Sequence, residues 1–359
     1  MEISVIMSVY NTKPDYLSEA IESILQQSYE DFEFIIIDDG TSNKETLGVL
    51  EKYKKRDSRI RLIVNQTNIG LTRSLNIGLQ TAQGRYIARM DSDDISHYRR
   101  LEKQYDYMEQ NQDIDILGCL IRKIGNLQVV ECSNYIDYTQ NDYESFIIKM
   151  LFYNVGPIHP TVMIRNDFLK KHNIKYDENI KKAQDYALWM ECISVGGKIK
   201  NLPEVLLEYR VHSAQITVMD NSEQIVYMQN VSIQNLKRLG FKMGEREYKM
   251  LVTLYSPEYN ADPICYIEAL NKLSLLNQQI NRFPVIKFNN EIKIRWIHKV
   301  IKCIAKKHDF SGMFHSYTYQ CIFSKGFLIW LKDYVLKLIY QKLYSKRNNN
   351  YEFYSNKEK

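Results

Sequence analysis

Three aspartates lie within four positions of one another in the stretch ARMDSDDIS, residues 88–96: Asp91, Asp93 and Asp94. Their carboxylates repel one another at pH 7, so their closeness calls for a source of positive charge. One source is a helix N-terminus, because residues 96–110 have helical composition and we expect at least one aspartate or serine of the stretch to cap that helix. The other is a hard divalent cation, which takes oxygen ligands. The residue types alone leave both interpretations open.

The composition is that of a globular protein, with 359 residues, 45% hydrophobic and 25% charged. This length allows two domains, or one large domain with an appendage. The six cysteines are scattered without a CxxC pair, which argues against a zinc knuckle or a disulfide framework and fits a reducing compartment. Residues 1–11 are typical of a first strand and not of a signal peptide. Because no long uncharged apolar run occurs, we expect a cytoplasmic protein without a membrane-spanning helix.

The net charge of +5 hides an asymmetry along the chain. Residues 281–359 contain 16 Lys and Arg against 5 Asp and Glu, whereas residues 1–280 contain 32 against 38. An acidic body with a basic tail predicts different roles for the two segments.

The first 120 residues alternate between strand-like and helix-like segments. The predicted strands are residues 3–10, 32–40, 60–65 and 85–90, and the predicted helices are residues 14–28, 45–56 and 71–82. Strands that are apolar along their whole length and separated by helices predict an α/β fold, with a mostly parallel sheet and helices on both of its faces.

Polar residues follow all four predicted strands. Because ligands of open α/β sheets bind at the carboxyl ends of the strands, this edge is the predicted functional site. The residues that we expect there, beside the acidic stretch, are Ser8, Val9, Tyr10, Asn11, Asp38, Asp39, Gly40, Asn65, Asn68 and Gly70.

The later segments are less regular. Residues 155–165 indicate a short loop that leads into a strand, residues 183–197 an amphipathic helix with glycine at its C-terminus, and residues 204–212 a further strand. Beyond about residue 220 helical patterns dominate, and residues 348–359 are predicted to be disordered.

With these motifs identified, the sequence resembles the bacterial family 2 glycosyltransferases, which are inverting nucleotide-sugar enzymes of the GT-A fold that build capsular and other surface polysaccharides. The resemblance covers roughly residues 2–215. It rests on SVIMSVYN (4–11), QQSYEDFEFIIIDDGTS (26–42), NIGLTRSLNIGLQTAQGRYIARMDSDD (68–94), QDYALWM (184–190) and YRVH (209–212). It implies a catalytic domain at residues 1–220, with a nucleotide-sugar half at about 1–120 and an acceptor half at about 121–220, followed by a helical, basic region at 221–347.

The resemblance implies that the acidic stretch is the family's DxD element, which holds Mn²⁺ or Mg²⁺ against the diphosphate of a UDP-sugar donor. One of Asp91 and Asp93 then contacts the ribose, and Asp93 or Asp94 ligates the metal, with the register left open. His212 resembles a late residue that reaches the metal or the diphosphate in some relatives, although an exposed loop histidine is an equal alternative.

The remaining donor contacts are also carried over by resemblance. Asp39 matches the residue that bonds the uracil, while an Asx turn is the alternative for Asp38. Arg73 lies in a segment near the nucleotide, or else faces solvent on a helix. The implied nucleotide-sugar-binding residues are Ser8, Val9, Tyr10, Asn11, Asp38, Asp39, Asn68, Gly70, Arg73, Asp91 and Ser92.

Asp185 matches the family's catalytic base, which takes the proton of the acceptor hydroxyl. Many relatives carry Glu before this residue, where this chain has Gln184. A helix N-cap is the alternative role for Asp185. His159 lies where relatives place a loop near the acceptor, but a structural role is favoured, and Trp189 is expected in the core more than against a sugar ring.

Residues 326–347 combine large apolar side chains with lysines, which is typical either of a helix at the surface of an anionic inner leaflet or of a helix packed on the catalytic domain. The expected function is transfer of a hexose or N-acetylhexosamine from a UDP-sugar to a hydroxyl of a glycan acceptor, expected to be lipid-linked. The alternatives are a nucleotidyltransferase and a non-catalytic sugar-nucleotide-binding protein. The acidic body argues against a nucleic-acid partner.

Overall fold

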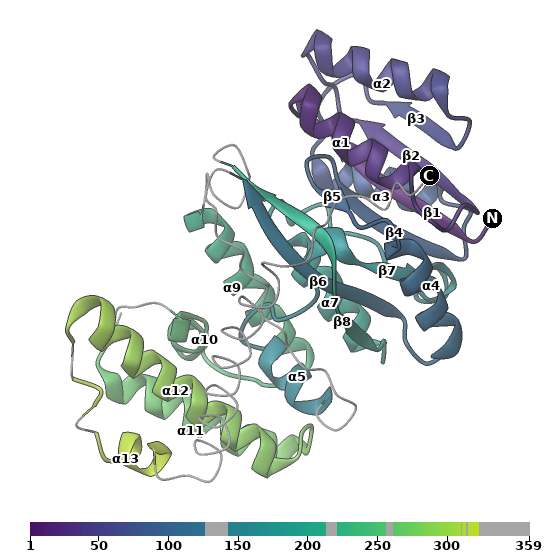
Figure 1. The fold of residues 1–359 in the computed structure, drawn as a ribbon. Helices are drawn as coiled ribbons and strands as arrows, with labels where there is room; N and C mark the ends of the chain where they lie inside the picture. Colours follow the sequence, from purple (N-terminus) through teal and green to yellow (C-terminus); the bar gives the residue numbers. More distant parts are fainter. Residues whose placement is uncertain (126–142, 213–220, 256–260, 310, 314, 323–359) are drawn as a thin grey trace, which may run out of the picture. The chain divides into compact units, whose positions relative to one another are not determined.

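The computed structural model describes residues 1–125, 143–212, 221–255, 261–309, 311–313 and 315–322 (Figure 1). The chain forms two compact units. The first comprises Met1–Asn141 and Asn154–Val231, and the second Asp142–Tyr153 and Ser232–Lys359. The predicted surface helix at 326–347 and the predicted disordered tail at 348–359 lie outside the described residues.

An eight-stranded sheet forms the centre of the first unit, in the order β3-β2-β1-β4-β7-β6-β8-β5. The strands are β1 (Ile3–Val9), β2 (Phe32–Asp38), β3 (Ile60–Val64), β4 (Tyr86–Asp91), β5 (Ile95–Ser96), β6 (Ile116–Gly125), β7 (Met163–Arg165) and β8 (Ile199–Val211). The first four are parallel, β7 is antiparallel to β4 and β6, β8 is parallel to β6, and β5 is antiparallel to β8. The mostly parallel α/β sheet that the alternating pattern predicts is therefore confirmed.

Helices cover both faces of this sheet (Figure 1). The helices of the first unit are α1 (Pro14–Leu25), α2 (Lys44–Arg56), α3 (Leu71–Thr81), α4 (Arg100–Gln110), α6 (Asn166–His172) and α7 (Gln184–Ser194). Val5 and Met7 of β1 belong to one buried cluster with residues of α1, α2 and α4. Ile6 points the other way, and a Cβ at Gly78 of α3 would lie 2.5 Å from its side chain. Alternate residues of β1 thus supply apolar side chains to the helices on both faces of the sheet.

The acidic stretch corrects the expectation of a capped helix. The helix that follows it, α4, begins only at Arg100, and its N-cap residue Arg99 makes no side-chain capping bond. The chain after Asp94 instead forms β5, in which Ile95 pairs with Glu208 of β8. No aspartate of the stretch caps a helix, because pairing with β8 takes up the residues between the acids and α4.

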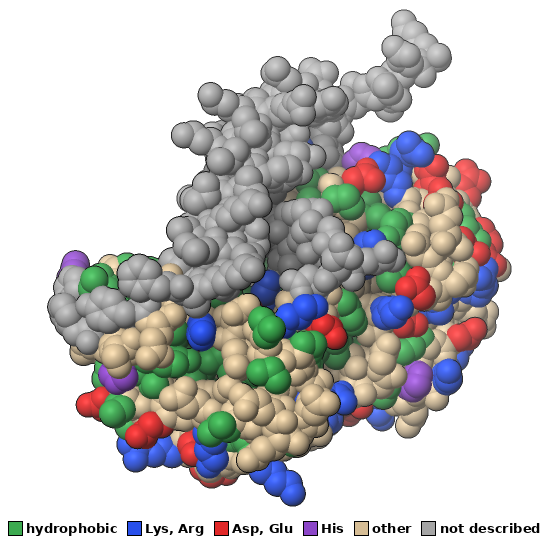
Figure 2. All heavy atoms as spheres, turned by 90° about the horizontal axis from the view of Figure 1, so that it is seen from below, with side chains coloured by type: hydrophobic (Ala, Val, Ile, Leu, Met, Phe, Trp, Pro, Cys, Tyr) green, Lys and Arg blue, Asp and Glu red, His purple; other side chains and the backbone are tan. Residues whose placement is uncertain are grey.

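The second unit is helical, as the sequence beyond residue 220 predicts. Its elements are α5 (Tyr143–Met150), α10 (Glu245–Val252), α11 (Pro263–Ile280), α12 (Val285–Lys307) and α13 (Ser316–Ile322), and α9 (Asn221–Arg238) contains the boundary residue Val231. Phe241, Phe283 and Phe288 stack with centroid separations of 5.6–6.4 Å. Acidic, basic and apolar side chains are interspersed on the face drawn in Figure 2. None of the described helices is long and apolar enough to cross a membrane.

Candidate active site

The carboxyl ends of the parallel strands bring the predicted residues together. Ser8 pairs with Asp91 of β4, and Val9 pairs with Asp38 of β2, so three of the predicted loops start side by side. This register follows from the strands themselves, because parallel neighbours of similar length end at the same edge of a sheet.

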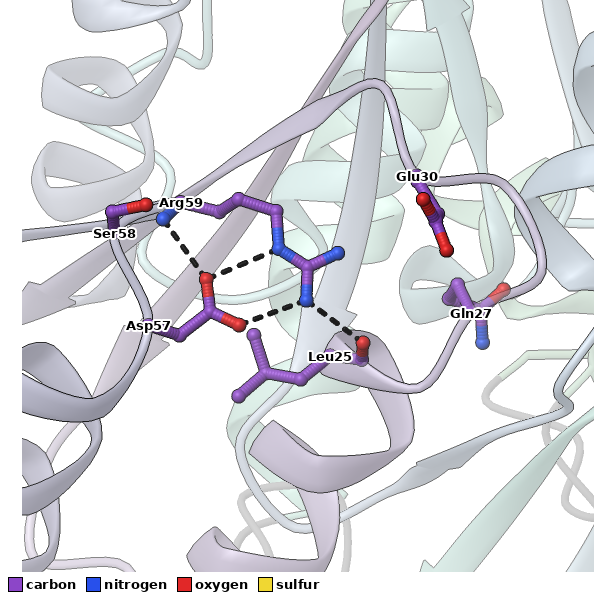
Figure 3. A pocket seen from close by; sticks show the side chains of 6 residues that line it. All are labelled: Leu25, Gln27, Glu30, Asp57, Ser58 and Arg59. Atoms are coloured by element: carbon purple, nitrogen blue, oxygen red, sulfur yellow. Dashed lines mark hydrogen bonds and ion pairs between the residues drawn. The ribbon is translucent and has the colours of Figure 1, made fainter.

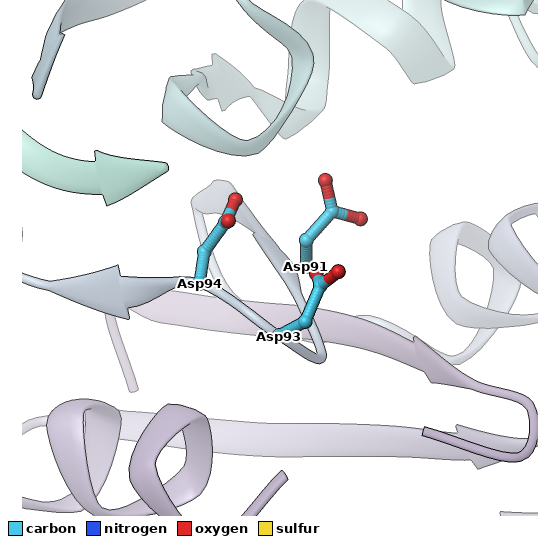
Figure 4. A group of neighbouring side chains, drawn as sticks. All are labelled: Asp91, Asp93 and Asp94. Atoms are coloured by element: carbon cyan, nitrogen blue, oxygen red, sulfur yellow. The ribbon is translucent and has the colours of Figure 1, made fainter. Parts of the chain in front are cut away.

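The acidic turn between β4 and β5 gathers its three carboxylates at one point. Asp91, Asp93 and Asp94 each offer an oxygen within 4.8 Å of the others (Figure 4). Burial, and then the charges of Asp91 and Asp93, raise the pKa of Asp94 well above its usual value. The pKa of Asp93 is also raised, first by burial and then by Asp91. The turn therefore concentrates negative charge that its surroundings do not fully balance.

The carboxylate oxygens of Asp91, Asp93 and Asp94 fit a hard divalent cation as ligands. Asp94 is fully buried, and its Oδ2 atom has no hydrogen-bond partner among the described residues. A buried carboxylate oxygen without a donor is costly in the apo protein and is available to a metal ion. Oxygen atoms from several carboxylates are the ligands that Mn²⁺ and Mg²⁺ prefer.

The end of β8 reaches back to this turn. The backbone N–H of Arg210 donates to Asp94 Oδ1 at 2.9 Å, and Arg210 Nε donates to the Asp93 carbonyl at 2.8 Å. His212 Nε2 lies 2.8 Å from Asp93 Oδ2. The structure thus brings His212 beside Asp93, while its contact with a metal or a diphosphate stays a prediction.

Arg89 of β4 lies beneath the turn and is 3% exposed. Its guanidinium forms an ion pair with the Asp91 carboxylate. Burial works to lower the pKa of Arg89, but the charge and hydrogen bond of Asp91, together with the charge of Asp94, hold the pKa above its usual value. The charge of Arg89 also lowers the pKa of Asp185, so its field reaches both the acidic turn and the predicted base.

Asn11 joins the first two predicted loops. Its Oδ1 atom accepts hydrogen bonds from the backbone N–H groups of Ser42 and Asn43 at 3.0 and 3.1 Å. Its φ of 49° is left-handed, a conformation that asparagine tolerates better than most residues. Tyr10, just before it, is 53% exposed. The hydrogen bonds of Asn11 therefore tie the loop after β1 to the loop after β2.

Asp38 and Asp39 are both buried at the end of β2. Asp38 Oδ1 accepts the Thr41 N–H at 2.9 Å, a bond to the backbone three residues further on that differs from the two-residue bond of an Asx turn. Asp39 accepts the backbone N–H groups of Ile69 and Gly70, each at 2.9 Å. Asp39 thus anchors the β3–α3 loop, and its predicted contact with uracil would use remaining acceptor capacity of the same carboxylate.

The β3–α3 loop holds the other predicted donor residues. Asn68 is exposed, and Gly70, with a φ of 92°, is the N-cap of α3. Arg73 is exposed on α3 and pairs with Glu178 at 3.1 Å. Ser92, in the acidic turn, bonds Thr12 at 2.7 Å and so links the turn to the β1 loop.

Asp185 lies in the first turn of α7 and is half-buried. The N-cap of α7 is Ala183, so Asp185 does not cap its helix. Asn154 Nδ2 donates to Asp185 Oδ2 at 3.0 Å. Burial raises the pKa of the Asp185 carboxyl, and bonds from the Tyr186 N–H and Asn154 oppose the shift. The surroundings of Asp185 therefore increase the basicity of its carboxylate.

His159 and Trp189 are structural in this fold. His159 is buried, with Nε2 2.7 Å from the Tyr176 hydroxyl. Burial, and then the charge of Arg89, lower its pKa well below the usual value. Trp189 is fully buried and packs edge-on against the His159 ring at 6.1 Å, which confirms its expected place in the core.

Three residues of the site were not predicted from the sequence: Arg89, Arg210 and Asn154. Arg89 could have been identified, because it is a charged residue inside the apolar run YIARM, where a buried strand was predicted. Asn154 could not have been identified, because an asparagine in an irregular segment is ordinary.

A polar hollow lies at the other end of the sheet. Leu25, Gln27, Glu30, Asp57, Ser58 and Arg59 line it (Figure 3). These residues precede β2 and β3, so the hollow is at the amino ends of the strands. Arg59 already bonds Asp57 Oδ2 at 2.8 Å and the Leu25 carbonyl at 2.9 Å. The hollow is thus separate from the candidate site.

A mostly parallel sheet with helices on both faces, followed by a helical region, is the arrangement of the GT-A glycosyltransferases. The model of the family described as glycosyl transferase family 2 matches residues 4–172. An uncharacterised glycosyltransferase of Methanocaldococcus jannaschii is 39% identical over 211 residues, which cover 58% of this chain and 70% of that relative. The O-antigen biosynthesis glycosyltransferase WbnJ of Escherichia coli is 37% identical over 214 residues, 59% of this chain and 80% of WbnJ. The chain belongs to glycosyltransferase family 2.

A solved structure supports the fold. S. aureus TarS 1–349 in complex with UDP-GlcNAc matches with a TM-score of 0.56 and 18% identity, over 87% of this chain and 89% of that chain. At this identity the likeness concerns the fold.

Proposed function

We propose that this glycosyltransferase is metal-dependent and inverting, and that it moves a hexose or N-acetylhexosamine from a UDP-sugar to a hydroxyl of a glycan. The observation that carries the proposal is the acidic turn at the carboxyl edge of the sheet, whose three carboxylates lie within 4.8 Å with one buried oxygen unpartnered. The UDP-GlcNAc named in the TarS complex supports a UDP-sugar as the donor.

On the donor side, Asp91, Asp93 and Asp94 would hold Mn²⁺ or Mg²⁺, with His212 beside Asp93. When bound, the ion supplies positive charge at the departing diphosphate. Tyr10 is exposed and would contact the uracil of the donor, and Asn11 holds the loop that carries Tyr10. Ser8, Val9, Asp38, Asp39, Asn68, Gly70, Arg73 and Ser92 complete the proposed donor contacts.

On the acceptor side, Asp185 would take the proton of the acceptor hydroxyl. The acceptor oxygen forms a bond to the anomeric carbon while the bond from that carbon to the diphosphate breaks, and the proton moves to the Asp185 carboxylate. Attack from the face opposite the leaving group inverts the anomeric configuration. Because burial raises the pKa of Asp185, its carboxylate is a stronger base than an exposed aspartate.

We further propose that the acceptor is a lipid-linked oligosaccharide of a bacterial surface polysaccharide, reached from the cytoplasmic side of the membrane. The name of WbnJ, an O-antigen biosynthesis enzyme, supports this class of acceptor. The basic segment at 281–359 would favour an anionic inner leaflet.

A screen of donors tests the proposal. Purified protein is incubated with UDP-Glc, UDP-Gal, UDP-GlcNAc or UDP-GalNAc in Mn²⁺ or EDTA, and released UDP is measured. We expect release from one donor, lost in EDTA and in the Asp93→Ala and Asp185→Asn variants. Asp106→Ala, which removes an exposed carboxylate of α4, is the matched control and should keep the wild-type rate. Release that is equal in EDTA and unaffected by Asp93→Ala would refute metal dependence.

A further inference from the structure

Asn154 is held in one orientation by two hydrogen bonds. Its Oδ1 atom accepts the backbone N–H of Gly156 at 3.0 Å, and its Nδ2 group donates to Asp185 Oδ2, also at 3.0 Å. Because a backbone N–H is only a donor, it must face the amide oxygen, and the amide N–H₂ is therefore directed to the carboxylate. The bond from Gly156 closes an Asx turn at residues 154–156, and this turn determines which end of the amide faces Asp185.

The turn at residues 154–156 packs against the core of the first unit. A Cβ at Gly156 would lie 2.5 Å from Trp189 Cδ1, so only glycine lets the backbone approach the indole this closely. Trp189 is fully buried, one turn after Asp185 on the same helix α7. The packing of Gly156 on Trp189 thus fixes the turn relative to the helix that carries Asp185.

The other groups that act on Asp185 come from different elements. Arg89 of β4 stabilises the carboxylate through its charge, and the backbone N–H of Tyr186 in α7 donates to it. Tyr176 faces it from the loop before α7 and stays neutral, because burial raises its pKa. His159, which bonds Tyr176, is also kept neutral by burial. Asn154 adds a neutral side-chain donor to this set.

We propose that Asn154 is a positioning residue for glycosyl transfer, whose amide N–H₂ orients the Asp185 carboxylate and keeps it ionised for proton abstraction. The proposal rests on the proposed function of Asp185 as the base. The acceptor proton passes to Asp185, and Asn154 exchanges no proton. The two hydrogen bonds of its amide and the contact of Gly156 with Trp189 carry the inference.

The Asn154→Asp variant separates the two roles of the amide. An aspartate keeps an oxygen for the Gly156 N–H, so the turn is retained, but it replaces the donor to Asp185 with a second carboxylate. Like charges at hydrogen-bonding distance raise the pKa of the base. Asn179→Asp is the matched control, because Asn179 lies in an exposed loop before the same helix.

The measurement is the pH profile of UDP release, with whichever of the four UDP-sugars gives the highest wild-type rate. For Asn154→Asp we expect kcat to fall by about tenfold or more at pH 7, the acidic limb of kcat/KM to move to higher pH, and KM for the donor to change by less than about twofold. Asn179→Asp should match the wild type. If Asn154→Asp proves unfolded by circular dichroism, Asn154→Ala replaces it, with a smaller shift of the same sign.

The outcomes distinguish this inference from the function on which it rests. A folded Asn154 variant with the wild-type rate and pH profile overturns the positioning role while the function of Asp185 stands. An Asp185→Asn enzyme that keeps the wild-type rate overturns the assignment of the base, and the inference with it. A fall in kcat without movement of the acidic limb assigns Asn154 to the structure of the turn and also overturns the proposal.

Discussion

His212 Nε2 lies 2.8 Å from Asp93 Oδ2, although 119 positions of the chain separate the two residues. The end of β8 brings them together, and Arg210 of the same strand bonds both Asp93 and Asp94. The acidic turn and the end of β8 therefore form one structure, in which the histidine contacts a carboxylate proposed to hold the metal.

Replacement of His212 by alanine should weaken Mn²⁺ binding by about 10–100-fold, because a ligand or a partner that orients a ligand is lost. Electron paramagnetic resonance of free Mn²⁺, titrated with protein in the presence of UDP, measures this. His172→Ala, in α6, is the control and should bind Mn²⁺ as the wild type does. Unchanged affinity in His212→Ala would remove His212 from the proposed metal site.

Replacement of Arg89 by methionine should destabilise the first unit by about 3–5 kcal/mol, because it leaves the Asp91 carboxylate without its buried partner beside two other acids. Urea unfolding in EDTA measures the loss. Arg61→Met, at an exposed position of β3, should change the free energy of unfolding by less than about 0.5 kcal/mol. A loss in Arg89→Met as small as that in Arg61→Met would show that the ion pair contributes little.

Two substitutions of Asn11 separate its backbone conformation from its side-chain bonds. Glycine tolerates the φ of 49° but loses the bonds to Ser42 and Asn43, whereas alanine loses the bonds and is strained as well. We expect UDP affinity to fall in Asn11→Gly by about fivefold and further in Asn11→Ala. Calorimetry provides the affinities. Equal wild-type affinity in both variants would exclude a role of Asn11 in shaping the donor loop.

His159 should be neutral at pH 6.5, where an exposed histidine is about half protonated. Burial holds its pKa well below the usual value, so the unfolded chain binds a proton below pH of about 6.5 that the folded protein excludes. The free energy of unfolding should therefore decrease as the pH falls below about 6.5, and His159→Gln should reduce this dependence. Histidine ¹⁵N chemical shifts follow the titration directly. A His159 ring that titrates near pH 6.5 would contradict the prediction.

The sequence carried enough information for the first four strands and the edge where they end, because uniformly apolar runs between amphipathic helices are typical of buried parallel strands. It did not reveal β6, whose run ILGCLIRKIG lies in a segment of mixed character. The start of α4 was also misplaced, because pairing of Ile95 with β8 is a long-range event that local composition does not encode.

The residues of the candidate site also differ in how far the sequence alone could identify them. Residues with a motif, such as Asp93 and Asp185, could be named from the sequence, and strand register explains why the loops meet. Arg210 and Asn154 could not, because their roles depend on hydrogen bonds to residues 117 and 31 positions away. Such partners become visible only when the chain is folded.

The most direct test of the central claim is calorimetric titration of UDP into the wild type and the isosteric Asp94→Asn variant, each in Mn²⁺ and in EDTA. Metal-dependent donor binding predicts that Mn²⁺ tightens UDP binding to the wild type by about tenfold or more and does not tighten binding to Asp94→Asn. The same UDP affinity of the wild type in Mn²⁺ and in EDTA would contradict the assignment of the acidic turn as a metal site.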